Sequence, residues 1–113
     1  MIMKKESYYD LVYYITSKIP EGRVSTYGAI ADYLSLGSAR MIGWALNQCN
    51  ATGNGDIPAH RVVNRKGELS GRVHFNPPSK MQASLGAEGI IVKDNRVENF
   101  EDLFWHPEEL DDK

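Results

Sequence analysis

Ile57-Pro58-Ala59-His60-Arg61-Val62-Val63 is the most informative stretch of this chain. The side chain of Ala59 is a methyl group with no lone pair and no ionisable proton, so it cannot act as a nucleophile. Residues 60–63 are rich in β-branched side chains and favour an extended segment. Short strings of this kind also arise by chance, so other parts of the chain must support any interpretation of the stretch.

Three helices are predicted upstream. Apolar residues recur at helical spacing in the first, which stops at Pro20-Glu21-Gly22. Ser25 or Thr26 can cap a second helix over residues 27–34, and a serine can cap a third over residues 38–48. Two short helices joined by a glycine-containing turn form the helix-turn-helix pattern, which alone is weak evidence for DNA binding. The apolar face of the first helix consists of Tyr9, Val12, Tyr13, Ile15 and Ile19.

Downstream, residues 50–56 are rich in glycine and asparagine and are predicted to form a loop. Two short strands, residues 60–63 and 68–70, are predicted to flank a turn at residues 65–67 and to make a small wing. After the break at Pro77-Pro78, Ser79 can cap a last helix that runs through Leu85. Residues 90–97 are predicted to be extended or hairpin-like. The sequence thus predicts a mainly α, winged helix-turn-helix-like fold with a short β wing.

The composition predicts a single domain over residues 1–113. A chain of 113 residues with 42% hydrophobic content can bury one core and is too short for two. Its single cysteine, Cys49, excludes an internal disulfide and is typical of a reducing setting. No apolar run approaches the roughly 20 residues of a membrane span, and the N-terminus lacks the apolar core of a signal peptide. We therefore expect a cytoplasmic protein with no membrane partner, associated with the nucleoid if its source is a bacterium.

Charge is distributed unevenly along the chain. Residues 1–80 contain ten basic and six acidic residues, for a net charge of +4, whereas residues 81–113 contain three and nine, for −6. The overall charge of −2 therefore does not argue against DNA binding, because phosphate contact depends on the local surface. The acidic segment at about residues 98–113 is expected to be a solvated C-terminal tail.

Several stretches occur in the order found in one known family. They are residues 22–31 (GRVSTYGAIA), 38–47 (SARMIGWALN), 57–63, 70–72 (SGR) and 86–90 (GAEGI). Through them the chain, from about residue 8 to about residue 92, resembles the O6-alkylguanine-DNA alkyltransferases, whose active-site motif has cysteine at the position of Ala59. The alanine, together with the ending at residues 102–107 (DLFWHP), makes it similar to the alkyltransferase-like proteins, non-enzymatic relatives that lack the cysteine.

The resemblance implies how the chain binds DNA. Arg40 matches the arginine that enters the duplex and hydrogen-bonds the orphaned cytosine, and Tyr27 matches the tyrosine that presses on the phosphate beside the flipped nucleotide. The third helix would enter the minor groove, where only small side chains permit close approach. Met41 and Trp44 are large, so part of this helix is expected to face the core. The implied DNA contacts are Tyr27, Ser38, Ala39, Arg40, Met41 and Gly43.

The resemblance also implies a pocket for the flipped base, lined by Ala59, Val62, Ser70, Gly71 and Arg72. A methyl group in place of a thiol enlarges this pocket slightly, which favours larger adducts as well as methyl. Many relatives without the cysteine have tryptophan at that position, so a role assigned to the tryptophan does not transfer to this chain. Arg72 matches an arginine that can contact the modified base, and a phosphate contact is an equal alternative.

Four further residues resemble parts of the enzymes' catalytic network. His60 and Glu88 match the pair that activates the thiol through a water-linked chain, and without a thiol they are expected to be structural polar groups. Arg61 resembles a structural prop, and Asn50 resembles an asparagine hinge, although one extra loop residue separates it from the motif. One cysteine and three scattered histidines show no zinc-site spacing, so we expect no metal, no cofactor and no catalytic residue.

The resulting hypothesis is a monomeric, non-enzymatic protein that binds double-stranded DNA containing O6-alkylguanine through the minor groove. It would flip the lesion into its pocket and flag it for nucleotide excision repair, whose proteins would be its further partners. Two alternatives remain open. One is a residual alkyltransferase or dealkylase that uses Cys49 or an activated water, although Cys49 is not expected to reach the pocket. The other is a winged-helix transcriptional regulator that reads a specific site.

Overall fold

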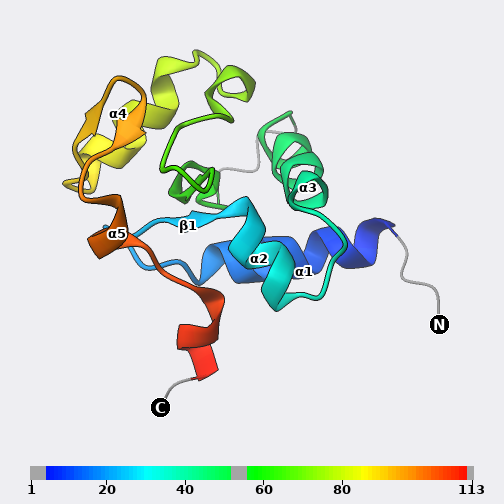
Figure 1. Ribbon diagram of the computed structural model, residues 1–113. Coiled ribbons are helices and arrows are strands. Elements are labelled where there is room, and N and C mark those ends of the chain that lie inside the picture. Colours follow the sequence, from blue (N-terminus) through cyan, green and yellow to red (C-terminus); the bar gives the residue numbers. More distant parts are fainter. Residues whose placement is uncertain (1–4, 52–55, 112–113) are drawn as a thin grey trace.

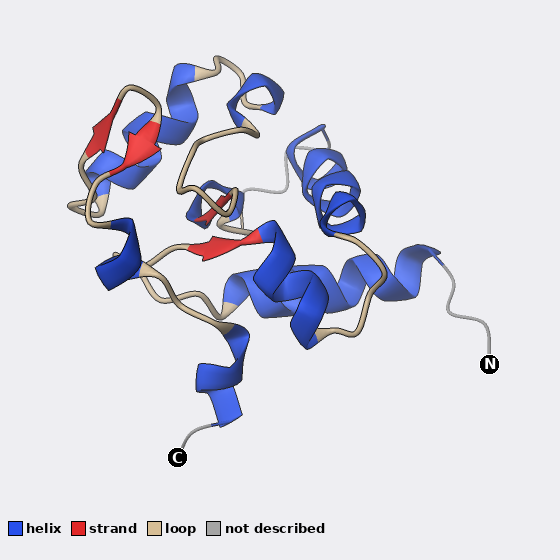
Figure 2. Ribbon diagram, viewed as in Figure 1, coloured by secondary structure: helices blue, strands red, loops and turns tan. Residues whose placement is uncertain are grey.

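The computed structural model describes residues 5–51 and 56–111, and it is mainly helical (Figure 1, Figure 2). The predicted fold class is therefore confirmed, and residues 52–55 of the predicted loop lie outside the described residues. The helices are α1 (Lys5–Ser17), α2 (Tyr27–Tyr33), α3 (Ala39–Ala51), α4 (Ser79–Ala87) and α5 (Phe100–Leu103). The strands are β1 (Ser25–Thr26), β2 (Val62–Val63), β3 (Val92–Lys93) and β4 (Arg96–Val97), and three 3-10 helices are η1 (Ala59–Arg61), η2 (Arg72–His74) and η3 (Pro107–Asp111).

The three N-terminal helices pack against one another, and in Figure 1 α2 crosses in front of α1 while α3 lies above α1. They enclose a core cluster because each presents apolar residues on one face at helical spacing. Of the face predicted for α1, Val12 and Ile15 are buried within the helix, whereas Ile19 is buried beyond its end. The fully buried members of this cluster with less than 2% exposure are Val12, Ile19, Ile30, Ile42, Ala45 and Val62.

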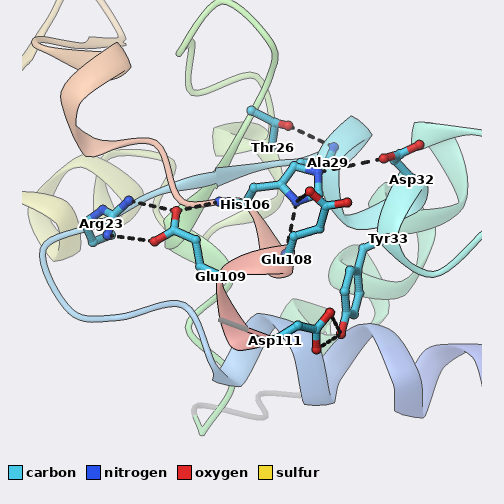
Figure 3. Close-up of polar contacts among 9 residues, drawn as sticks. All are labelled: Arg23, Thr26, Ala29, Asp32, Tyr33, His106, Glu108, Glu109 and Asp111. Atoms are coloured by element: carbon cyan, nitrogen blue, oxygen red, sulfur yellow. Dashed lines mark hydrogen bonds and ion pairs between the residues drawn. The ribbon is translucent and has the colours of Figure 1, made fainter. Parts of the chain in front are cut away.

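The helix-turn-helix pair begins with a side-chain cap. Thr26 precedes α2 with an extended backbone, and its hydroxyl oxygen accepts a hydrogen bond from the Ala29 amide at 3.0 Å (Figure 3). The predicted cap is therefore confirmed for Thr26 and not for Ser25. Helix α3 begins directly after Ser38 and continues to residue 51, which places Asn50 in the helix and corrects the loop start predicted at residue 50.

The predicted wing is wrong in its strand partners. Strand β2 pairs in parallel with β1, with Ser25 opposite Val62, instead of pairing with residues 68–70. The turn after β2 does form, since the Asn64 amide donates to the Glu68 carbonyl at 3.1 Å. Glu68 then makes an isolated bridge to Arg96, beside the antiparallel hairpin of β3 and β4. The hairpin-like segment predicted over residues 90–97 is confirmed.

Helix α4 supplies the second core cluster, where Met81 and Leu85 are fully buried. Ser79 is its first residue and not its cap, because Pro78 occupies the cap position and no side chain caps the helix. The proline pair does mark the predicted break before this helix.

The acidic C-terminal segment is not a solvated tail. Trp105 is only 3% exposed and belongs to the first core cluster. Its amide donates to the Val24 carbonyl at 2.7 Å, and the Val24 amide donates to the Leu103 carbonyl at 3.1 Å. Arg23 forms an ion pair with Glu109 at 3.2 Å and donates to the Phe104 carbonyl at 2.6 Å. Figure 3 shows Glu109 turned toward Arg23 and Asp111 toward the Tyr33 hydroxyl group, so acidic side chains also attach the segment to the rest of the molecule. Composition alone does not reveal these contacts.

Within residues 5–51 and 56–111, no helix is both long enough and apolar enough to cross a membrane.

Candidate functional site

Ala59 lies at the start of η1, on the wall of a cavity of about 460 Å³. The cavity lies between the end of α3, the segment leading into η1, and the start of α4. Only 5% of Ala59 is exposed, so its methyl group lies on the inner wall. The side chains that share this cavity include Cys49, Asn50, Phe75, Lys80 and Ser84.

A carboxylate-centred network lies directly beside Ala59. The His60 Nε2 atom is 2.6 Å from Glu88 Oε2, and the Arg61 guanidinium donates to both carboxylate oxygens at 2.9 and 3.0 Å. Arg61 also donates to the Ile19 carbonyl at 2.8 Å, and the Gly22 amide donates to Glu88 Oε1 at 2.8 Å. The network therefore joins η1 to the end of α4 and to the turn after α1.

Electrostatics keep Glu88 ionised. Burial by itself raises the pKa of this carboxyl, but hydrogen bonds from Arg61, the Gly22 amide and His60 outweigh burial and lower the pKa to about 2. An ionised carboxylate only accepts hydrogen bonds, so the proton in the contact between His60 and Glu88 lies on Nε2. The predicted pair of His60 and Glu88 is in direct contact, with Arg61 bound to the same carboxylate.

Cys49 lines the same cavity as Ala59, although Ser70, Gly71 and Arg72 of the predicted base pocket do not line it. The thiol comes from the buried face of α3, one residue before Asn50. Burial raises the pKa of Cys49, so the protonated form predominates at neutral pH. Because the thiolate is the nucleophile, this environment works against attack by Cys49.

Tyr27, the first residue of α2, lies against the loop that precedes η2. Its hydroxyl group hydrogen-bonds with Ser70, and a Cβ built on Gly71 would lie 2.5 Å from the hydroxyl oxygen. Burial raises the pKa of Tyr27, and the hydrogen bond with Ser70 opposes part of that shift. The structure thus brings together three of the residues predicted to act on a flipped nucleotide.

The predicted pocket residues do not all share one cavity. Ala59 lines the cavity described above, whereas Ser70, Gly71 and Arg72 do not. Arg72 starts η2 and donates from its guanidinium to the Leu69 carbonyl at 3.0 Å, which holds the side chain against its own loop. Val62 is 0% exposed and packs in the first core cluster, so it lies behind the surface of this site and not on it.

Helix α3 presents an exposed surface at its first turn. Ser38, Ala39 and Arg40 are exposed, and Gly43 is half-buried. Met41 packs partly against the core, and its carbonyl accepts a hydrogen bond from the Tyr8 hydroxyl at 2.6 Å. The expectation that large side chains of this helix face the core therefore holds for Met41 and is wrong for Trp44, which is 53% exposed.

Some residues of this site could not be predicted from the sequence. Gly22 holds Glu88 through its backbone amide, and its φ of +85° favours glycine at this position, but the sequence alone does not show that the amide meets a carboxylate 66 residues away. Phe75 and Lys80 also line the cavity, although Phe75 precedes the predicted break at residues 77 and 78 and Lys80 was predicted only as part of a helix start. Within the part of the chain that the structure describes, no cluster of three or more His, Cys, Asp or Glu side chains could hold a metal ion.

Comparison with known proteins shows the family of this chain. Residues 7–90 match the family described as 6-O-methylguanine DNA methyltransferase, DNA binding domain. Alkyltransferase-like protein 1 of Schizosaccharomyces pombe is 31% identical over 110 residues, which cover 93% of this chain and 100% of that protein. The chain belongs to the alkyltransferase-like family.

A further relative and a solved structure extend the comparison. The DNA base-flipping protein of Escherichia coli is 32% identical over 106 residues, covering 91% of this chain and 78% of that protein. The crystal structure of S. pombe Atl1 in complex with damaged DNA containing O6-carboxymethylguanine matches with a TM-score of 0.77 at 30% identity. That match covers 93% of this chain and 100% of the Atl1 chain.

Proposed function

We propose that this alkyltransferase-like protein binds double-stranded DNA containing O6-alkylguanine through the minor groove, flips the damaged base and holds it without removing the alkyl group. The observation that carries the proposal is Ala59 beside an intact His60, Arg61 and Glu88 network. By the resemblance to the alkyltransferases, Ala59 stands at the position of the reactive cysteine, and these three residues stand at the positions of its neighbours. Support also comes from the similarity in fold to Atl1, which was crystallised with alkylated DNA.

Arg40 and Tyr27 are proposed to perform the flipping. Arg40 is exposed at the start of α3, so it is free to enter the duplex in place of the extruded base. Tyr27 lies at the start of α2, next to Ser70 and Gly71, where it can press on the phosphate beside the lesion. Ser38, Ala39, Met41 and Gly43 would line the approach of α3 to the groove, which is roughly 6 Å wide in B-DNA.

Ser70, Gly71 and Arg72 do not line the cavity of Ala59, so the site proposed for the flipped base lies between Ala59 and the loop of residues 70–72, with Val62 beneath it. Extrusion of a base costs a few kcal/mol, less for a lesion that pairs weakly, and this difference favours damaged sites. The minor groove distinguishes base pairs poorly, so binding there suits a protein that must find a lesion in any sequence. Asn50 is proposed to brace the end of α3.

The absence of transfer is part of the proposal. Ala59 cannot accept an alkyl group, and the raised pKa of Cys49 disfavours its thiolate. A protein that only holds the lesion is useful if another system removes it. We therefore propose that the occupied DNA is handed to nucleotide excision repair.

The test combines binding with intact mass. Matched duplexes with guanine, O6-methylguanine or O6-benzylguanine at one position are incubated with the protein, and affinity and protein mass are both measured. We expect tighter binding to the alkylated duplexes and no change in mass. A stoichiometric mass gain would show alkyl transfer, and loss of that gain in Cys49→Ala would assign it to Cys49. Strong preference for one sequence with indifference to alkylation would instead indicate a winged-helix regulator.

A further inference from the structure

Trp44 is the feature that the proposed roles leave unexplained. Its side chain is 53% exposed on α3, although its neighbours Ile42 and Ala45 are fully buried. The other tryptophan of the chain, Trp105, is 3% exposed in the core. An exposed indole is costly in water, since tryptophan presents the largest apolar surface of any side chain. This position is therefore a candidate contact surface.

The surroundings of Trp44 indicate which partner fits. Arg40 lies one turn earlier on the same face of α3, and Gln48 lies one turn later, both exposed. A Cβ added at Gly43 would meet no atom within 4 Å, so no neighbouring atom covers the helix surface at this residue, which precedes Trp44. The sequence of α3, ARMIGWALNQCNA, contains no Asp or Glu. This helix face carries an exposed aromatic ring and a cation but no anion. Such a face fits a polyanion as its binding partner better than it fits an acidic or neutral protein surface.

We propose that Trp44 is a second minor-groove contact of α3, which places its indole against the sugars and base edges of the duplex beside the lesion. This inference rests on the proposed function, because it takes α3 as the helix that enters the groove. Four residues of α-helix advance about 6 Å along the axis. At about 3.4 Å for each base step, Trp44 meets the DNA about two steps from Arg40.

The chemistry of the indole suits this place. Its flat apolar ring can lie along the deoxyribose wall or wedge a base step, as apolar side chains of minor-groove proteins do when they bend DNA. Its Nε1–H is a donor, and every base pair presents acceptors in the minor groove, so the contact tolerates any sequence. Trp44 would thus strengthen binding to damaged and undamaged duplexes alike, whereas discrimination would stay with the lesion pocket.

The experiment uses the full chain, with fluorescence anisotropy of labelled duplexes to measure affinity and tryptophan emission to monitor Trp44. In Trp105→Phe, Trp44 is the only tryptophan, so its emission reports its own environment. The comparison variants are Trp44→Ala, Trp44→Phe and, as the control, Tyr14→Ala on α1, whose aromatic side chain is similarly exposed at 58%. Circular dichroism checks that each variant is folded.

We expect Trp44→Ala to weaken binding about 5- to 150-fold on both the lesion and the plain duplex, by analogy with aromatic side chains that stack on the bases of single strands. Trp44→Phe should retain part of the affinity, Tyr14→Ala should match wild type, and Trp44 emission should change on addition of either duplex. Unchanged affinity of folded Trp44→Ala, with unchanged emission on saturation, would overturn the inference while leaving the proposed function intact. If wild type itself binds no DNA, the proposed function fails.

Self-association is the rival explanation of the exposed indole. Sedimentation of wild type and Trp44→Ala at high concentration separates the two. A dimer that requires Trp44, together with unchanged DNA affinity of the variant, would assign the indole to a second copy of the chain and contradict the groove contact. A wild-type monomer whose DNA affinity depends on Trp44 would support it.

Discussion

The Tyr27 hydroxyl group and Gly71 lie so close together that a Cβ at residue 71 would be 2.5 Å from the hydroxyl oxygen. This spacing is shorter than any normal contact between a methyl carbon and an oxygen. The glycine therefore sets the position of the tyrosine, which also hydrogen-bonds with Ser70. Tyr27 begins α2, and its packing against Gly71 joins that helix to the loop before η2.

Gly71→Ala should displace the Tyr27 side chain and impair base flipping, because the new methyl group and the hydroxyl oxygen cannot both occupy their places. Extrusion can be measured with a fluorescent base analogue at the lesion. Gly28→Ala is the matched control, since a Cβ at Gly28 in α2 meets no atom within 4 Å and alanine favours a helix. Equal extrusion by both variants and wild type would remove Tyr27 from the flipping mechanism.

Acid should destabilise the protein through Glu88. Its pKa is lowered from 4.5 to about 2, so the ionised carboxylate contributes stability that is fully present above pH 4.5 and is lost as the pH falls toward 2. The shift corresponds to about 3 kcal/mol of unfolding free energy. Glu88→Gln should cost a similar amount at pH 7 and flatten the dependence between pH 4.5 and 2. Denaturant unfolding at several pH values measures this, with the exposed Glu98→Gln as the control. A steep acid transition that persists in Glu88→Gln would place the effect elsewhere.

Ala59→Cys should restore little or slow alkyl transfer, although His60 and Glu88 remain 2.6 Å apart. Transfer requires the alkyl carbon to lie in line with the sulfur, and about 1 Å of misplacement can reduce a rate about 100-fold. Time-resolved intact mass measures the transfer, in a Cys49→Ala background so that the new thiol is the only one. Transfer at the rate of a repair enzyme would show that Ala59 alone separates this chain from catalysis.

Arg40→Ala should weaken binding to the lesion duplex by roughly 1 to 3 kcal/mol, because the vacated stack loses a charge-assisted contact in a desolvated place. Lys18→Ala is a suitable control, since Lys18 is an exposed cation just beyond the end of α1 and lies 5.2 Å from the centre of the Tyr14 ring. The affinity of both variants for the lesion duplex is measured by titration at one salt concentration. A loss of the same size in the two variants would reduce Arg40 to a general electrostatic contribution.

Arg72→Ala distinguishes two roles for this guanidinium, which rests on the Leu69 carbonyl. If Arg72 contacts the flipped base, the variant should lose affinity mainly for the alkylated duplex. If it contacts a phosphate, the loss should be equal on both duplexes and the salt dependence should become shallower. We expect the selective loss, measured on matched duplexes over a series of salt concentrations.

Local patterns predicted the helices well. The apolar spacing before Pro20 and the Thr26 cap both depend on neighbours a few residues away, so they are visible in the sequence. The prediction that Asn50 begins a loop was wrong, because helix α3 continues to residue 51 although polar residues lie near its end. Ser79 lies inside α4 because the preceding Pro78 already has helical dihedral angles.

Contacts between residues far apart in the sequence could not be predicted from local patterns. Strand β2 has its partner in β1, about 37 residues earlier, and nothing near Val62 specifies that choice. The resemblance led us to expect that His60 and Glu88 belong to one network. It did not predict that the Gly22 amide donates a hydrogen bond to Glu88. The acidic composition of residues 98–113 concealed the buried Trp105 and Pro107, which pack the segment on the rest of the molecule.

The hydrogen bonds between Val24 and residues 103–105 have a kinetic consequence. They join segments about eighty residues apart, and such distant partners meet only after a large loop has closed. We expect the docking of Trp105 to be a late event in folding and its release an early event in unfolding. Amide hydrogen exchange should then show the Val24 and Trp105 amides opening together, at a lower free energy than the amides in the middle of α1.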